Sequence, residues 1–322
     1  MTIVTGLTVR VPAKLNLQLA VGPPRPDGYH DLVTVFHAVS LFDEITAEAA
    51  GQDGVSVSGE GADRVPGNRD NLALRAVAAL RAAAGPRAAG GVHITIAKRI
   101  PVAAGLAGGS ADAAAALVAC NELWGAGLSQ AQLLEIAARV GSDVAFALLG
   151  GTAVGRGRGE RLTPALAPAT PYHWVLAFAD GQLSTPAVYA ALDRLRAAEA
   201  GGSAAERPSA AKHGTAEPAL DAALMAALRS GDARQLGRAL SNDLQPAALS
   251  LFPALRKTLA AGLELGALGA LVSGSGPTCV FLAASADRAL DLAASLAGAG
   301  VCRSVARATG PVPGAAVVPA AR

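Results

Sequence analysis

The chain has 322 residues, a length that predicts two domains, each able to bury a core of its own. Its formal net charge of +2 gives no support for a nucleic acid or an anionic membrane surface as partner. No run of about 18 or more strongly apolar residues occurs without Pro, Gly or a charge, which argues against a membrane-spanning helix.

Residues 7 to 21 alternate between apolar and polar side chains and so predict a strand. Lys14 and Asn16 fall on the same face of this strand, about 7 Å apart. A solvated strand face is the ordinary explanation of that pattern, and a pair of polar groups aimed at a ligand is the alternative. The turn Pro23-Pro-Arg-Pro-Asp-Gly follows, and Tyr29 and His30 come directly after it.

Strands and helices are then predicted in alternation. The expected strands cover residues 33–45, 55–57 and 92–96, and the expected helices cover 71–84, 111–123, 129–140 and 142–149. Asp143 falls in the first turn of the last helix, where a carboxylate is favoured by the helix dipole. A glycine-rich hairpin over 150–160 leads to a domain boundary near Pro164.

The segment from Pro101 to Ala111 links the strand at 92–96 to the alanine-rich helix after it. Glycines at three of its positions let the backbone approach a ligand closely. Ser110 is expected to cap the helix, whose free N–H groups and dipole create a site for an anion. A glycine-rich connection without a ligand fits these three glycines equally well.

The second half of the chain predicts a further sheet with helices. The expected strands cover residues 173–179, 268–282 (with a glycine turn) and 301–306. One helix is expected around Val188, and others at 219–229, 233–240 and 253–264. The segment from Ala197 to Pro218 is predicted to be a mobile insertion, and the chain from Gly310 a loose tail.

The loop from Pro101 to Ala111 resembles the Pro-x-x-x-Gly-Leu-x-Gly/Ser-Gly/Ser-Ser-Ala motif of the galactokinase, homoserine kinase, mevalonate kinase and phosphomevalonate kinase superfamily. Other segments are similar to motifs of one branch of that superfamily: Pro12-Ala-Lys-Leu-Asn-Leu, Asp27-Gly-Tyr-His-Asp-Leu, Gly141-Ser-Asp-Val-Ala-Phe, Asn242-Asp-Leu-Gln-Pro and Ser273-Gly-Ser-Gly-Pro-Thr. The resemblance therefore covers nearly the whole chain.

This resemblance implies an α+β protein of two domains. Residues 1–164 would form a domain of the ribosomal-protein S5 second-domain type, 165–310 a ferredoxin-like domain, and 311–322 a tail. The implied activity is ATP-dependent phosphorylation of the 2-hydroxyl of a cytidine diphosphate-linked methylerythritol in the non-mevalonate isoprenoid pathway. Mg²⁺ would come with the nucleotide, without a permanent metal site on the protein.

The resemblance also assigns roles to individual residues. Lys14 and Asp143 match the catalytic pair, Lys98 and Asn71 match positions near the nucleotide, Tyr29 and Tyr189 match aromatic groups that sandwich the cytosine, and Asn16, His30 and Thr185 match its polar contacts. The residues expected to hold the ATP phosphates are Pro101, Val102, Ala103, Ala104, Gly105, Leu106, Ala107, Gly108, Gly109, Ser110 and Ala111.

Phosphoryl transfer suits these residue types, because its loose transition state needs positioning and charge neutralisation above all. A lysine supplies a compact positive charge, and an ionised carboxylate beside it can accept the hydroxyl proton or orient the hydroxyl. The alternatives are a sister kinase acting on homoserine or a mevalonate derivative, a decarboxylating lyase, and a silent nucleotide-binding homologue.

Three scattered cysteines, Cys120, Cys279 and Cys302, match no metal-binding spacing. We expect buried thiols in a reducing compartment, and hence a cytoplasmic protein. We also expect a monomer or a weak homodimer that binds a small molecule.

Overall fold

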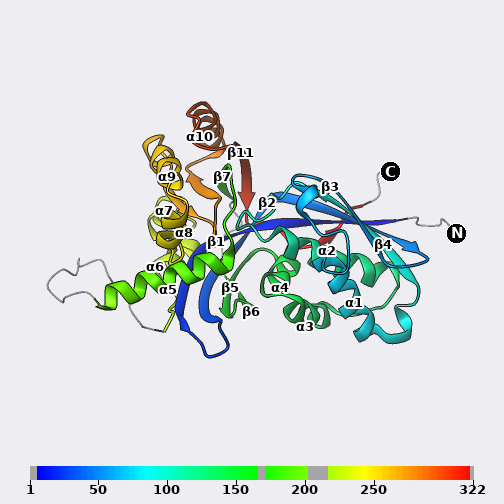
Figure 1. Ribbon diagram of the computed structural model, residues 1–322. Helices are drawn as coiled ribbons and strands as arrows, with labels where there is room; N and C mark the ends of the chain where they lie inside the picture. The colour runs from blue at the N-terminus through cyan, green and yellow to red at the C-terminus, as the bar shows by residue number, and fades with distance from the viewer. Residues whose placement is uncertain (1–5, 166–170, 202–216, 320–322) are drawn as a thin grey trace.

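The computed structural model describes residues 6–165, 171–201 and 217–319. Two adjoining bodies are each built around a sheet of their own (Figure 1). The strands are β1 (Leu7–Pro24), β2 (His30–Ala50), β3 (Gly54–Gly59), β4 (Gly91–Lys98), β5 (Thr152–Gly157), β6 (Arg161–Pro164), β7 (Tyr172–Phe178), β8 (Ser241–Asn242), β9 (Gly269–Val272), β10 (Cys279–Ala283), β11 (Ser304–Gly310) and β12 (Ala316–Val317). The α-helices are α1 (Leu72–Ala84), α2 (Gly108–Leu123), α3 (Gln130–Val140), α4 (Ser142–Leu149), α5 (Thr185–Gly201), α6 (Ala222–Ser230), α7 (Ala233–Ala239), α8 (Gln245–Leu251), α9 (Leu255–Glu264) and α10 (Ala286–Gly298).

The first sheet has the strand order β12-β1-β2-β4-β3, and β5, β6 and β8 join it off this path. The long β1 and β2 form an antiparallel pair, whereas β3 runs parallel to β4. Helices α1 to α4 gather on one side of this sheet (Figure 1). The arrangement confirms the expected mixture of strands and helices in the N-terminal half.

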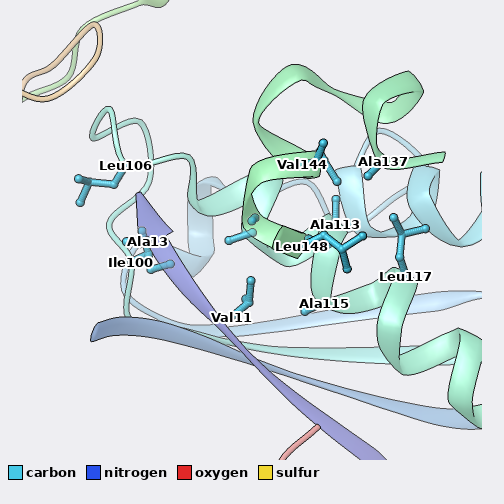
Figure 2. Packing of buried hydrophobic residues seen from close by; sticks show 14 of the residues in the cluster. Val11, Ala13, Ile100, Leu106, Ala113, Ala115, Leu117, Ala137, Val144 and Leu148 are labelled. Carbon is cyan, nitrogen blue, oxygen red and sulfur yellow. The ribbon is translucent and has the colours of Figure 1, made fainter. Parts of the chain in front are cut away.

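Helix α2 is the centre of the first core because its side chains are small. All residues from Ala111 to Leu117 are buried, so the helix packs against neighbours on every side. Figure 2 shows Ala113 of α2 near Val144 of α4, whereas Ala115 of α2 lies on the side toward the strands. Alanine lets these elements approach closely, and the loop that precedes α2 is thereby fixed against the sheet.

The second sheet has the order β11-β7-β10-β9, with every neighbouring pair antiparallel. If the four strands are numbered by their order in the chain, they lie side by side in the order 4-1-3-2. Along the chain, α5 to α9 connect strand 1 to strand 2, and α10 connects strand 3 to strand 4. This β-α-β-β-α-β arrangement confirms the ferredoxin-like expectation. The limits of the two domains, near Pro164 and Gly310, stay predictions.

Strand β1 belongs to both bodies. Leu15 and Leu17 lie in the first hydrophobic core, whereas Leu19 and Val21 lie in the second, with Val175 of β7. Because β1 is covered on both faces, its polar side chains do not form a solvated face. Lys14 is only 7% exposed.

The end of the chain differs from the loose tail that the sequence predicts. Residues 311–318, here called the C-terminal strap, return along the first sheet: β12 pairs with β1, and the Gly151 amide donates to the Val312 carbonyl at 2.8 Å. The final three residues lie outside the described part. The segment Ala197–Pro218, predicted to be a mobile insertion, also lies largely outside it, after a start that continues α5.

Two further expectations concern membranes and thiols. Within the described part of the chain, no helix is long and apolar enough to cross a membrane. All three cysteines are free; Cys120 and Cys279 are buried, and Cys302 is partly exposed. Burial raises the pKa of Cys120 and of Cys279 to about 12, so these two thiols are unreactive near neutral pH.

Candidate active site

A cavity of about 630 Å³ lies between the two domains. The first domain contributes β1, β2, the loop before α2 and the start of α4, and the second contributes the start of α5 and the glycine turn after β9. A cleft of this size accommodates a drug-sized ligand.

Lys14 and Asp143 meet in this cavity from two different elements. The Lys14 ammonium on β1 lies 3.9 Å from an Asp143 carboxylate oxygen in the first turn of α4. Burial lowers the pKa of Lys14, and the negative charge of Asp143 partly opposes that shift. The Asp143 side chain is 31% exposed, so it can reach a ligand.

Asn16 fixes the position of the lysine. Its side-chain oxygen accepts a hydrogen bond from Lys14 at 2.6 Å, and its amide donates to the Thr34 hydroxyl at 2.8 Å. Thr34 in turn donates to the Gln18 carbonyl at 2.7 Å. The polar face of β1 is thus an ordered network beside the cavity, as the ligand-facing alternative requires.

The loop before α2 lies along the cavity, although its ending differs from the expected one. Helix α2 begins at Gly108, and its N-cap is Ala107, whose backbone is left-handed (φ 59°) and whose side chain makes no cap. Ser110 therefore lies inside the first turn, and the expectation that it caps the helix is wrong. The predicted phosphate-loop residues line the cavity except for Leu106 and Ala111, which are buried.

The start of α2 suits a phosphate group. The first N–H groups of a helix have no partner within it and carry the positive end of its dipole. Ala103 and Ala107 both have positive φ, of 54° and 59°, which is uncommon for residues other than glycine. Strained backbone of this kind gathers at ligand sites.

Lys98 lines the cavity, but its ammonium is engaged within the protein. It donates to Asp43 and, at 2.7 Å, to Asp112. Burial raises the pKa of Asp112 to about 8, an effect that the Lys98 charge opposes. Asp43 also accepts from the Arg99 and Ile100 amides, so this buried cluster fixes the backbone just before the loop.

Asn71 also has a local role in the structure. It caps α1 by accepting from the Ala73 amide at 2.9 Å, and its own amide donates to the Pro66 carbonyl at 2.8 Å. Asn71 is buried and lines the cavity. Its side chain therefore shapes the cavity wall by fixing the segment before α1.

The expected cytosine contacts are only partly brought together. Tyr189 and Thr185 line the cavity, whereas Tyr29 and His30 lie outside its lining among the described residues. Tyr29 is 55% exposed. His30 packs against Tyr189 with ring centroids 5.0 Å apart and pairs with Asp193 at 3.0 Å.

Two groups of residues that line the cavity were not predicted from the sequence. Arg158 lines it, and its guanidinium lies over the Tyr29 ring at 5.2 Å. The turn Gly274–Gly276 also lines it, and Ser275 hydrogen-bonds to Thr185 at 2.8 Å. The arginines among glycines at 155–159 and the Ser-Gly-Ser-Gly-Pro-Thr motif were the available signals.

Comparison with known proteins identifies the family of the chain. Residues 71–151 match the family described as GHMP kinases N terminal domain, and residues 224–302 match GHMP kinases C terminal. The 4-diphosphocytidyl-2-C-methyl-D-erythritol kinase of Thermobifida fusca is 58% identical, covering 98% of this chain and 99% of that protein. A crystal structure of 4-(cytidine 5'-diphospho)-2C-methyl-D-erythritol kinase is 36% identical with a TM-score of 0.72, covering 94% of this chain and 98% of that one.

A homoserine kinase from Cytophaga hutchinsonii has a similar TM-score of 0.73, covering 99% of both chains, but only 20% identity. That likeness shows the fold alone. The identity over nearly full length to the Thermobifida fusca protein is far higher, and so the chain belongs to the 4-diphosphocytidyl-2-C-methyl-D-erythritol kinase family of GHMP kinases.

Proposed function

We propose that this protein transfers the γ-phosphoryl group of ATP to the 2-hydroxyl of 4-diphosphocytidyl-2-C-methyl-D-erythritol, in isoprenoid precursor synthesis. The observation that carries the proposal is the Lys14–Asp143 pair, which faces the same cavity as the loop before α2. One end of the cavity thus suits phosphate, and the pair suits an alcohol.

The two catalytic side chains have complementary tasks. Lys14 provides positive charge for the transferring phosphoryl group, whose charge is spread over its oxygens in a loose transition state. Asp143 accepts the hydroxyl proton or orients the hydroxyl. Asn16 holds the ammonium in place, which limits reorganisation during the transfer. Mg²⁺ accompanies the nucleotide in this proposal and supplies further charge neutralisation.

Recognition of the cytidine diphosphate part would use Tyr189 and Arg158, which line the same cavity. Tyr189 offers a flat ring, and stacking of a base on such a ring contributes about 1–3 kcal/mol. Arg158 offers a guanidinium suited to a diphosphate. Tyr29 would complete a sandwich only if the exposed turn that carries it moved toward Tyr189. His30 and Thr185 remain the proposed polar contacts.

The test is a comparison of kcat/KM, with ATP, for the cytidine diphosphate-linked alcohol, its uridine counterpart, homoserine and mevalonate. We expect strong preference for the cytidine compound and a new phosphate on its 2-hydroxyl, located by ³¹P NMR. Equal turnover of an alcohol without a nucleotide would assign the chain to a sister activity.

A pair of arginine variants sharpens this test. Arg158→Ala should raise KM for the cytidine diphosphate compound, since Arg158 lines the cavity. Arg156→Ala on the same hairpin should leave KM unchanged, because Arg156 is exposed and outside the cavity lining.

A cytoplasmic location and a monomeric or weakly dimeric state belong to the proposal as well.

A further inference from the structure

The Asn242 side chain connects the strand that carries Lys14 to the glycine turn of the second domain. Its own strand, β8, pairs in parallel with β1, with Asn242 opposite Leu19. Its amide donates to the Val272 and Gly274 carbonyls, both at 2.7 Å. Its oxygen accepts from the Leu244 amide at 2.9 Å. One side chain therefore holds both the start and the middle of the turn.

That turn forms the wall next to the Lys14 ammonium. A Cβ atom on Gly274 would lie 3.1 Å from the Lys14 Nζ and 3.2 Å from the Gly105 carbonyl oxygen. The Ser273 hydroxyl donates to the same Gly105 carbonyl at 3.1 Å. The second domain thus lies so close to a lysine of the first that a side chain on Gly274 would crowd the ammonium.

We propose that Asn242 is a positioning residue, which holds the turn Ser273–Gly276 against Lys14 and so keeps water away from the ammonium. The amide acts through the turn and touches none of the proposed reacting groups itself. The inference rests on the proposed function only for the catalytic role of Lys14.

The solvation of Lys14 gives a direct readout of this role. Burial is the larger cause of its lowered pKa, and part of that burial comes from the turn. Among the described residues that contact the ammonium, Asp143 on α4 bears a charge, whereas Asn16, Phe36 and Gly274 do not. If the turn moves away, water reaches the ammonium and its pKa should rise.

The experiment measures acetylation of the Lys14 amine by mass spectrometry as a function of pH, in the full-length protein without ligand. Exposed Lys257 on α9 serves as the internal reference. In Asn242→Ala we expect the Lys14 midpoint to move to higher pH and the plateau rate to rise. Turnover should fall about tenfold or more, since small misplacements near reacting groups cost up to about 10²-fold.

Asn121 provides a matched control. It clamps a loop in the same way, donating to the Leu128 carbonyl at 3.2 Å and accepting from its amide at 3.0 Å, and it lies outside the cavity lining. Asn121→Ala should leave the Lys14 profile unchanged. An equal shift in this control would overturn the proposal, because it would show general loosening.

Asn242→Ser adds no charge and keeps an acceptor, but its hydroxyl can donate to only one of the two carbonyls that the Asn242 amide holds. Its Lys14 midpoint should therefore fall between those of wild type and Asn242→Ala. This variant also decides the question should Asn242→Ala fail to fold. Lys14 profiles identical to wild type in the folded variants would refute the role of Asn242. Since labelling needs no substrate, that outcome is distinct from a wild type that phosphorylates none of the tested alcohols.

Discussion

Among the described neighbours of the Lys14 ammonium, Asp143 has the largest effect on whether it keeps its proton, because Asn16 and Phe36 are uncharged. Burial pulls the pKa of the ammonium down, and the carboxylate pushes it up. As pH rises through that pKa, the lysine loses its charge and its ability to neutralise a phosphoryl group. Activity should therefore fall as the solution becomes alkaline, at a pH lower than that at which an ordinary lysine loses its proton.

Asp143→Asn should lower turnover by about 10²–10⁴-fold, the usual loss when a general base is removed. It should also move the alkaline limb of the kcat profile to lower pH, because the charge that raises the Lys14 pKa is gone. The measurement is kcat against pH for both proteins. Asp291→Asn, at an exposed position of α10, is the control and should match wild type. An unmoved limb would show that another group titrates there.

At the scale of elements, the site consists of two glycine-containing loops that interlock. Gly105 has φ +75°, and a Cβ atom on it would lie 2.1 Å from the Ser273 carbonyl oxygen. Gly109, in the first turn of α2, has only Leu72 nearby, at an ordinary 3.5 Å. The two glycines line the same cavity but differ in how much room a side chain would have.

Gly105→Ala should consequently destabilise the protein by about 1–3 kcal/mol, the usual cost of overpacking. Gly109→Ala should leave the free energy of unfolding within about 0.5 kcal/mol of wild type. Urea-induced unfolding without nucleotide compares the two variants directly. Equal stability of both variants would mean that the loops do not press on each other.

Local patterns could be predicted from the sequence, and long-range contacts could not. The capping box at Ser129 and Gln132 is present because both residues lie within one turn. Helix α8 was missed, although Pro246 lies in its first turn, where a missing N–H is tolerated. No spacing rule indicates that an alanine, Ala107, takes a left-handed conformation, or that Gly274 will lie against Lys14.

The same reasoning explains the partial success at the substrate end. The sequence motifs identified Tyr29, His30 and Tyr189 as substrate-binding residues. Which of these side chains contact one another depends on how the turn that carries Tyr29 and His30 is placed relative to α5. The structure brings His30 to Tyr189 and leaves Tyr29 beneath Arg158. The Lys98 ammonium was likewise expected near the nucleotide, and the two buried carboxylates that engage it were not anticipated.

At the scale of the whole molecule, the C-terminal strap joins the two ends of the chain. Its backbone bonds reach α4 and β1: the Ala315 amide donates to the Ala147 carbonyl at 3.0 Å, and the Val318 amide donates to the Thr8 carbonyl at 2.8 Å. Because α4 also carries Asp143, the strap supports the helix on which a proposed catalytic residue lies.

Ending the chain at Gly310 should therefore lower the free energy of unfolding by at least about 2 kcal/mol, since each hydrogen bond lost contributes about 0.5–1.5 kcal/mol. A chain that ends at Pro319 keeps all these bonds and should match wild type. Thermal unfolding of the two truncated proteins provides the comparison. A shorter chain as stable as the longer one would show that the strap adds nothing to stability.

The strap has a further consequence for synthesis on the ribosome. One edge of β1 is paired with β12 and β8, which leave the ribosome long after β1 itself. Until then the nascent chain exposes the unpaired backbone edge of an apolar strand, which is a template for wrong pairing with other chains. The first domain to be translated is therefore among the last parts to be completed, and the growing polypeptide depends on early protection of that edge.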